Sequence, residues 1–318
     1  MALLTVLLLL AVIGVLMTTA LETVSHAVHL ATNARISTQS RYYAGGIELM
    51  ALHRLEAIAK AADGHLSGDG WLGQPIVLET TEGGKLIAIP SDGGNCFNLN
   101  SLADGDRPDA LVARPRGIAQ FVALATSLGI AGADARRIAV GVADWIDADG
   151  VPDPLGGEDD SYRRLNPAYL PANRLLAEAS EIRAVAGVTP ALYDLLRPWV
   201  CALPTTDMSP VNLNTLQPSQ APLLAMILPG RLSIDAARQI LMQRPPGGWR
   251  DALDFWRQEA LAGLKPSGQE LDQPKLTTRY FNLDIRTEQS GFVTRHSALL
   301  DILPGRSRIL LRRWTADE

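Results

Sequence analysis

The pattern of apolar positions near the start of the chain predicts one long helix. No charged side chain occurs from Met1 to Leu21, and the first charge is Glu22. About 20 apolar residues in a helix span the hydrocarbon core of a bilayer, which is roughly 30 Å thick. Apolar residues then recur at helical spacing with no proline through residue 62. We expect a continuous helix from near residue 2 to about residue 60, with its membrane part at residues 1–24.

A cleaved secretory signal is the alternative interpretation of this apolar stretch. Such a signal has a basic segment before the apolar one and a small-residue cleavage site after it. The stretch before Glu22 has neither. The pattern therefore favours a membrane helix that continues, unbroken, into a water-exposed amphipathic helix.

The remaining pattern changes twice, from strand-like to helical and back. Residues 75–102 alternate apolar stretches with glycine-rich turns, as short strands and hairpins do. From about residue 104 to 265 apolar residues take helical spacing, with Gly, Pro and Asp at the breaks. Residues 275–314 return to alternation and β-branched residues, which predicts three strands with turns at Ser-Gly and Pro-Gly. The chain is therefore α+β, and a β layer interrupted by helices indicates an insertion.

Composition narrows the class of protein without identifying it. A hydrophobic content of 47% with 20% charged residues is typical of folded proteins. A length of 318 residues is enough for about two domains. The net charge of -5 argues against nucleic acid as a partner, because phosphate binding needs a basic face. The two cysteines, Cys96 and Cys201, are too few and too far apart for a zinc finger or ribbon.

An acidic stretch, WIDADGVPDPLGGEDDSY, is the strongest candidate for chemistry. It places six carboxylates between residues 147 and 160 with no Lys or Arg among them. It is not an EF-hand loop, because Val151 and Pro152 occupy positions five and six, where that loop needs a ligand and a glycine. Calcium still suits such a stretch, since it binds six to eight oxygens in flexible geometry. A solvated loop and a catalytic carboxylate pair of the glycosidase type remain open. We expect Trp145 to anchor the core.

Two helical segments have the shape of helix-hairpin-helix units. EIRAVAGVTPALYDLL contains a glycine turn, and residues 212–244 repeat the shape, so the helical region can consist of two related modules. In DNA-binding versions this turn is glycine-rich and flanked by Lys or Arg, whereas here Glu181 and Asp194 lie close to it. Protein contact is the favoured interpretation. The chain has no HExxH, GxSxG or P-loop motif, and we expect no enzyme activity.

Several of these segments together resemble a known family. The N-terminal helix with RYYAGGIELMAL resembles that of mature type IV pilins and pseudopilins. The ordered motifs NLNSL, DWIDADGVPDPLGGEDDSY, NPAYLPANRLL and NLNTL resemble minor pseudopilin K of the type II secretion system over most of residues 95–270. Pilins normally carry Glu at the fifth mature position, where it is thought to pair with the amine of the subunit ahead, and this chain has Thr5. A subunit without that glutamate suits the tip of a filament.

The resemblance implies a fold and a set of boundaries. We expect a pilin-like fold, in which a long helix packs on an antiparallel sheet, with a large all-α domain of two SAM-like modules inserted. The expected parts are the membrane helix (1–24), the first pilin-like part (25–103), the first module (104–204), the second module (205–270) and the C-terminal strands (271–318).

The resemblance also implies a function, a location and partners. The chain would be a minor pseudopilin that caps the periplasmic pseudopilus and supports protein secretion across the outer membrane. It would be anchored in the inner membrane by a single pass, with a methylated N-terminus left by prepilin peptidase. Its partners would be minor pseudopilins I, J and H and the major pseudopilin G. The filament and membrane contacts would come from the start of the helix: Met1, Leu3, Leu4, Thr5 and Leu7. The alternative is a membrane-anchored periplasmic hydrolase that uses the acidic stretch.

The resemblance further implies structural calcium in the inserted domain. The expected ligands are the acidic residues that match the family's motif, with Asp153 less favoured: Asp147, Asp149, Glu158, Asp159 and Asp160. Because a periplasmic head lies in an oxidising compartment, we predict a disulfide between Cys96 and Cys201. Two buried free thiols are the alternative.

Overall fold

The computed structural model describes residues 2–61, 72–80, 83–289 and 291–314. Met1, one of the predicted filament residues, lies outside them. The helices are α1 (Ala2–Ala61), α2 (Pro115–Ser127), α3 (Gly132–Ile146), α4 (Asp159–Arg163), α5 (Pro190–Leu196), α6 (Ala221–Ala225), α7 (Ile234–Met242), α8 (Ala252–Trp256) and α9 (Gly268–Asp272). The strands are β1 (Ile76–Glu79), β2 (Lys85–Asp92), β3 (Phe97–Asn98), β4 (Ala103–Asp104), β5 (Val112–Ala113), β6 (Val200–Cys201), β7 (Tyr280–Gln289), β8 (Phe292–Asp301) and β9 (Arg308–Arg313). Short 3₁₀ helices join them: η1 (Leu99–Leu102), η2 (Pro108–Ala110), η3 (Ala179–Ala184), η4 (Arg197–Trp199), η5 (Pro218–Gln220) and η6 (Glu259–Leu261).

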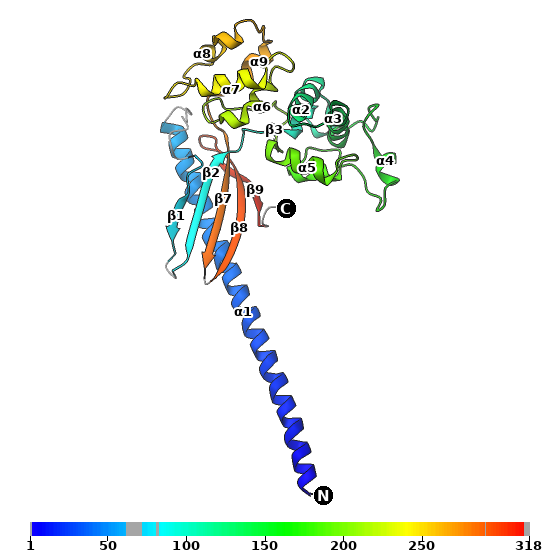
Figure 1. Cartoon of the computed structure of the whole chain (residues 1–318), viewed down its shortest axis with the longest axis vertical. Coiled ribbons are helices and arrows are strands. Elements are labelled where there is room, and N and C mark those ends of the chain that lie inside the picture. The colour runs from blue at the N-terminus through cyan, green and yellow to red at the C-terminus, as the bar shows by residue number, and fades with distance from the viewer. Residues whose placement is uncertain (1, 62–71, 81–82, 290, 315–318) are drawn as a thin grey trace.

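An antiparallel sheet lies against the upper part of α1, and the lower part of α1 projects beyond it (Figure 1). The strand order is β1-β2-β7-β8-β9. Neighbouring strands β2 and β7 are separated in sequence by the whole helical region, which emerges after Asp92 and returns before Tyr280. The predicted long helix, the three C-terminal strands and the helical insertion are therefore confirmed.

The apolar N-terminal part of α1 satisfies its own polar groups. The threonine hydroxyls donate to backbone carbonyls three or four residues earlier, for example Thr5 to Ala2 at 2.8 Å and Thr23 to Thr19 at 2.8 Å. A polar group in lipid without a partner costs several kcal/mol. These threonines are consequently compatible with an apolar environment.

Apolar packing and one buried carboxylate hold α1 on the sheet. Ile47 and Leu55 of α1 belong to a core cluster with Phe281 and other buried residues of β2, β7 and β8. Within this contact Glu48 is fully buried, with Oε2 2.7 Å from Nε of Arg312 and Oε1 3.2 Å from Nε2 of His296. Burial raises the pKa of Glu48, but His296 and Arg312 outweigh it and lower the pKa below 4.5. The carboxylate is therefore charged in the folded protein.

The helical region has a core of its own, separate from that of α1 and the sheet. Residues 97–103, expected with the sheet, lie in this helical core instead, with Phe97, Leu99 and Leu102 fully buried. The reason is that β3 pairs in parallel with β6, the strand after α5 and η4. Residues 97–103 thus pack with the first helical unit, which extends to β6. The second helical unit follows it, from Val211 to α9.

The two Asn-Leu-Asn motifs perform the same structural task in two places. The Asn100 side chain donates to the carbonyls of Leu176 and Leu203 and accepts from the amide of Leu176. Asn214 repeats this pattern with the carbonyls of Trp249 and Leu276 and the amide of Trp249. A buried amide that joins distant segments in this way fixes the loops of its unit.

Each helical unit also contains a helix–turn–helix segment of the predicted shape. In the first, η3 leads through Gly187, at φ 89°, to α5. In the second, α6 leads through Gly230, at φ 70°, to α7. The second helix of each pair begins at a hydroxyl N-cap, Thr189 and Ser233, whose oxygen accepts a backbone amide of the first turn. The repeat in the sequence is a repeat of structure.

Candidate metal site and membrane helix

The acidic stretch forms the loop between α3 and α4, and it brings three carboxylates together. Helix α3 ends at Ile146, and the backbone of Asp147 is already extended. Carboxylate oxygens of Asp147, Asp149 and Glu158 lie within 4.8 Å of one another. Asp147 and Glu158 are only 4% and 6% exposed, and Asp149 lies at the surface. Two carboxyl groups are thus held below the surface, and a third lies at the surface.

The buried carboxylates lack the donors that such groups need. Oδ1 of Asp147 and both carboxylate oxygens of Glu158 are buried and have no hydrogen-bond partner in the described part of the chain. Burial, together with the neighbouring acids, raises the pKa of Asp147 to about 7 and that of Glu158 to about 7. A bound cation would supply the missing partner to all three oxygens. Hard oxygen ligands in a flexible loop fit calcium.

The other predicted ligands take different positions. Asp159 and Asp160 lie in the first turn of α4, where they pair with Arg163 one turn later at 2.6 and 3.2 Å. The structure does not bring these two carboxylates into the cluster. Asp153, the less favoured residue, contributes its backbone amide to Oδ2 of Asp144 at 3.1 Å.

Asp144 is a residue of this site that the sequence analysis missed. It is 1% exposed, on the last turns of α3, and its charge raises the pKa of both Asp147 and Glu158. Burial and nearby Asp153 raise its own pKa to about 6. A Cβ on Gly156 would lie 2.0 Å from Asp144 Oδ2, so the loop can cross here only with glycine. The available signal was an Asp within an otherwise apolar helix face.

Aromatic side chains at the two ends of the acidic loop pack against each other. Trp145 on α3 contacts Tyr162 on α4 edge to face, with ring centroids 5.1 Å apart, and Tyr169 at 6.2 Å. Trp145 and Tyr162 are both buried. The prediction that Trp145 anchors the core is confirmed, and the anchor fixes where the loop starts and ends.

The two cysteines meet where β3 and β6 pair. Cys96 directly precedes β3 and Cys201 ends β6, and their Cα atoms are 5.8 Å apart with the sulfur atoms at bonding distance. This is within the range that disulfides require. Of the two alternatives from the sequence, the geometry favours the bond over free thiols.

The start of α1 has the properties of a membrane span. Its mean hydropathy reaches 2.6 over a window in which nothing is buried inside the molecule. The predicted membrane residues Leu3, Leu4 and Leu7 are 76%, 70% and 59% exposed. Nothing in the described part of the chain covers these leucines, and a continuous apolar surface of this kind is typical of a membrane or protein contact.

Comparison with known proteins identifies the family. Two family models of the same description, Type II secretion system (T2SS), protein K, match residues 95–205 and 211–279. A relative named type II secretion system protein K from Pectobacterium carotovorum is 33% identical, over 98% of this chain and 95% of its own length. The chain belongs to the protein K family of type II secretion.

Other members of the protein K family agree in sequence and structure. The relative from Klebsiella pneumoniae is 36% identical over 82% of this chain and 79% of its own. The solved GspK-GspI-GspJ complex from enterotoxigenic Escherichia coli contains a chain with TM-score 0.79 and 27% identity, over 90% of this chain and 99% of that one. This chain is accordingly a minor pseudopilin of type II secretion, and its relatives are named for secretion rather than for an enzyme activity. The two family models coincide with the two helical units, and the first includes the acidic loop and both cysteines.

Proposed function

We propose that this subunit caps the tip of the periplasmic pseudopilus, in complex with minor pseudopilins I and J, and so supports secretion across the outer membrane. The observation that carries the proposal is the likeness to a chain solved together with GspI and GspJ, over almost the whole of both chains. The helical units lie at the end of the sheet away from the N-terminus and to one side (Figure 1). A subunit this wide at its head suits the end of a filament better than its shaft.

The finer classification of the fold belongs to the same proposal. Helix α1 against an antiparallel sheet corresponds to a pilin-like fold, and the two helical units correspond to SAM-like modules. The repeated helix–turn–helix segments support this interpretation, as do the repeated Asn-Leu-Asn motifs.

Thr5 supports a position with no subunit ahead of it. Its hydroxyl is satisfied within α1 by the carbonyl of Ala2. A glutamate here would need an amine partner from another subunit, and an unpaired charge at the bilayer centre costs about 2.5–3.5 kcal/mol. The uncharged residue suits a tip subunit, which has no such partner.

The proposed location follows from α1. The subunit would be anchored in the inner membrane by one span, with its head in the periplasm, after prepilin peptidase has cut it and its N-terminus has been methylated. Pseudopilin H and the major pseudopilin G would lie further down the same filament. No nucleic-acid role is proposed.

The acidic loop would hold structural calcium. Asp147, Asp149 and Glu158 would bind the ion, and calcium would neutralise carboxylates that otherwise repel each other. Asp159 and Asp160 would stay with Arg163. The ion would serve to fix the loop between α3 and α4 in one shape.

The exposed face of α1 above the membrane is the proposed contact surface for pseudopilins I and J. Tyr42, Leu49 and Met50 are 76%, 54% and 63% exposed. Gly46, between them on the same face, has open space where a Cβ would stand. Glycine inside a helix costs about 1 kcal/mol relative to alanine, and packing within the subunit does not require it here.

Assembly tests the proposed function. The soluble part of the chain, from residue 25, is produced together with the soluble parts of pseudopilins I and J of the same system. Light scattering after gel filtration is expected to give one copy of each. Met50→Glu should lower the yield of complex at least tenfold, because a charge enters the apolar contact. Met242→Glu is the matched control, since Met242 is 69% exposed and belongs to α7, outside the proposed contact face of α1. Equal loss with both variants, or no complex at all, would refute the proposal.

A further inference from the structure

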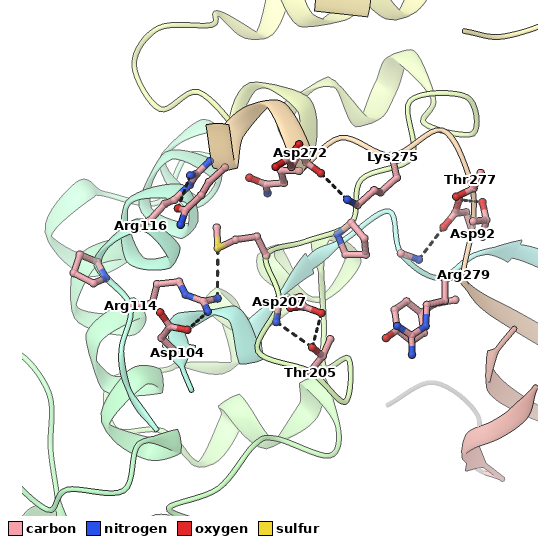
Figure 2. Close-up of a pocket in the computed structure, with 18 residues that line it drawn as sticks. Asp92, Asp104, Arg114, Arg116, Thr205, Asp207, Asp272, Lys275, Thr277 and Arg279 are labelled. Atoms are coloured by element: carbon pink, nitrogen blue, oxygen red, sulfur yellow. Dashed lines mark hydrogen bonds and ion pairs between the residues drawn. The ribbon is translucent and has the colours of Figure 1, made fainter. Parts of the chain in front are cut away.

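A cavity of about 880 Å³ lies where the sheet meets both helical units. Figure 2 shows its lining, with side chains from the first unit on one side, the second unit above and the start of β7 on the other side. Cavities of roughly 300–1,000 Å³ are the size that proteins use to bind ligands. None of the roles described above for α1 or the acidic loop uses this cavity.

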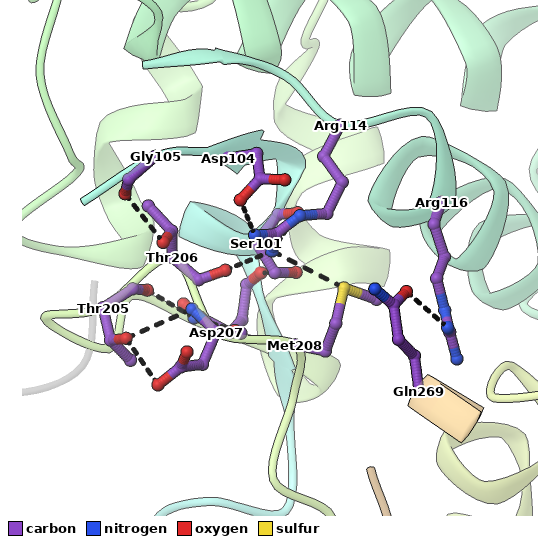
Figure 3. A network of polar contacts seen from close by, with 11 residues as sticks. Ser101, Asp104, Gly105, Arg114, Arg116, Thr205, Thr206, Asp207, Met208 and Gln269 are labelled. Atoms are coloured by element: carbon purple, nitrogen blue, oxygen red, sulfur yellow. Dashed lines mark hydrogen bonds and ion pairs between the residues drawn. The ribbon is translucent and has the colours of Figure 1, made fainter. Parts of the chain in front are cut away.

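Two of the arginines that line the cavity are fully engaged in its walls. Arg114 pairs with Asp104 and donates to the carbonyl of Thr206, which holds the segment after β6 in place (Figure 3). Arg279 forms two bonds to Asp301, at 2.6 and 3.1 Å. These guanidinium groups already have carboxylate partners and are structural.

Arg116 differs from them, because no carboxylate among the described residues lies within ion-pair distance of it; Glu270, which attracts it electrostatically, is paired with Arg231. Its Nη1 donates to the amide oxygen of Gln269 at 3.0 Å, as Figure 3 shows. Its Nε and Nη2 are buried and have no acceptor in the described part of the chain. Burial lowers the pKa of this guanidinium, and the attraction of Glu270 offsets that effect only in part. A carboxylate is the partner that a guanidinium binds with two parallel hydrogen bonds.

The backbone around Arg116 adds to the positive potential. Arg116 is the second residue of α2, after Pro115, and no side chain caps this N-terminus. The amides of the first turn carry the positive end of the helix dipole. Lys275, across the cavity in Figure 2, bonds through Nζ to the carbonyl of Asp272 and forms no ion pair among the described residues. The cavity is thus lined by two cations that form no ion pair within the described part of the chain.

The lining also holds the acids Asp92, Asp104, Asp207 and Asp272, and Asp272 lies between Arg116 and Lys275 in Figure 2, so the mixed lining argues against a simple anion site. Asp92 accepts the hydroxyls of Thr215 and Thr278, each at 2.5 Å. Asp207 accepts the hydroxyl of Thr205 at 2.8 Å, and Asp272 is exposed at the rim. Carboxylates and hydroxyls are acceptors for main-chain amides. A lining with cations at some points and acceptors at others fits a polypeptide better than a small anion.

We propose that this cavity is a docking site for an extended segment of a partner protein that carries an acidic side chain. Arg116 receives the carboxylate, which replaces the neutral amide of Gln269 as the acceptor at Nη1. Lys275 stabilises the same charge from the other side. The segment's main chain lies between the two helical units and the sheet. The site is independent of α1 and goes beyond the contact proposed for pseudopilins I and J.

Peptide binding to the full chain in detergent micelles tests this site. The probe is a fluorescein-labelled, blocked pentapeptide, Ala-Asp-Glu-Asp-Ala, and its counterpart is Ala-Asn-Gln-Asn-Ala. Fluorescence anisotropy should show saturable binding of the acidic peptide at low salt, with at least tenfold weaker binding of the amide peptide. Arg116→Gln should weaken binding of the acidic peptide at least tenfold. Lys275→Gln should weaken it severalfold, and because Lys275 is exposed, this variant should leave the fold intact. Arg238→Gln is the control, because Arg238 pairs with Asp235 on α7 outside the cavity.

The other outcomes would overturn the proposal. Equal affinity for both peptides would exclude carboxylate recognition, and unchanged affinity in both Arg116→Gln and Lys275→Gln would exclude this cavity. Displacement of the peptide by succinate at the same concentration as by unlabelled peptide would indicate a small-anion site instead of a protein-docking site. Met50→Glu should bind the peptide normally, so failure here and failure of assembly through α1 can be told apart.

Discussion

At the scale of single residues, cation binding by the acidic loop would depend on which of its carboxylates face inward. Asp147 and Glu158 are buried without donors, whereas Asp159 and Asp160, next in sequence, point to Arg163. The sequence predicted the cluster as a whole but could not separate its members, because burial depends on how α4 turns after Glu158. Asp144 escaped prediction for the same reason, as it lies on a buried helix face that belongs to the core by pattern.

Calcium is expected to stabilise the protein, and Asp147→Ala should abolish that effect. A ligand at a thousandfold excess over its Kd stabilises by about 4 kcal/mol. Thermal melts of the fragment from residue 25, in calcium and in chelator, measure the difference. Asp160→Ala, at an exposed residue that pairs with Arg163, should keep the full calcium response.

In the metal-free protein, Asp147→Ala is expected to have the opposite effect on stability. Asp147 titrates near 3.8 when unfolded and near 7 in the fold, so its burial is tolerated below the first value and becomes destabilising as pH rises through the second. In chelator at pH 8, Asp147→Ala should therefore be at least as stable as the unchanged protein. A calcium response that survives in Asp147→Ala would contradict the site.

At the scale of elements, α1 and the sheet are joined by a charge as well as by apolar contacts. Glu48 pairs with Arg312 of β9 and lies beside His296 of β8, so one side chain of α1 contacts two strands. The period of the apolar residues predicted that α1 would be long and amphipathic. It could not predict that Glu48 lies on the buried face, because its partners His296 and Arg312 are distant in sequence.

Glu48→Gln should change the acid stability of the protein. The lowered pKa of Glu48 means that its contribution is present above the unfolded value of 4.5 and is lost as pH falls through the folded value. The variant should be less stable at pH 7 by roughly 1–3 kcal/mol, because Arg312 is partly exposed. The difference should shrink below pH 4.5, as urea unfolding at several pH values can measure. Glu288→Gln, which breaks an exposed pair with Arg286, should change stability by less than about 1 kcal/mol at any pH.

The bond between Cys96 and Cys201 ties β3 to β6 across a separation of 105 residues. Closing a loop of this length stabilises by up to about 4 to 5 kcal/mol in the chain-entropy model. Denatured, unreduced protein should therefore show no titratable thiol, and reduction should lower the midpoint of urea unfolding. Two free thiols in the unreduced protein would contradict the disulfide.

Sequence patterns gave the order of elements but not the positions of their boundaries. Residues 97–103 alternate like a strand, yet they complete the helical core because β3 finds its partner in β6. The Asn-Leu-Asn motifs were visible as a repeat. Their buried contacts, which join each motif to segments such as Leu176 and Trp249, arise only in the folded chain.

At the scale of the whole molecule, three parts are arranged along one axis. The apolar part of α1 lies at one end, the sheet in the middle and the helical units at the other end and to one side (Figure 1). The helical units contact the sheet at a junction that includes Asp92, Arg279 and the cavity of Figure 2, and Glu178 of the first unit also pairs with Arg313 of β9. This order places the widest part of the subunit farthest from the N-terminus, as the proposed capping role requires.

The most direct test of the capping role is the position of this subunit on the filament. Pseudopili isolated from cells that overproduce the major pseudopilin G are labelled with gold-tagged antibody fragments against residues 104–270 and viewed by electron microscopy. The capping role predicts one label at a single end of each labelled filament. Labels spread along the shaft would contradict the capping role, because they would show that the subunit repeats within the filament.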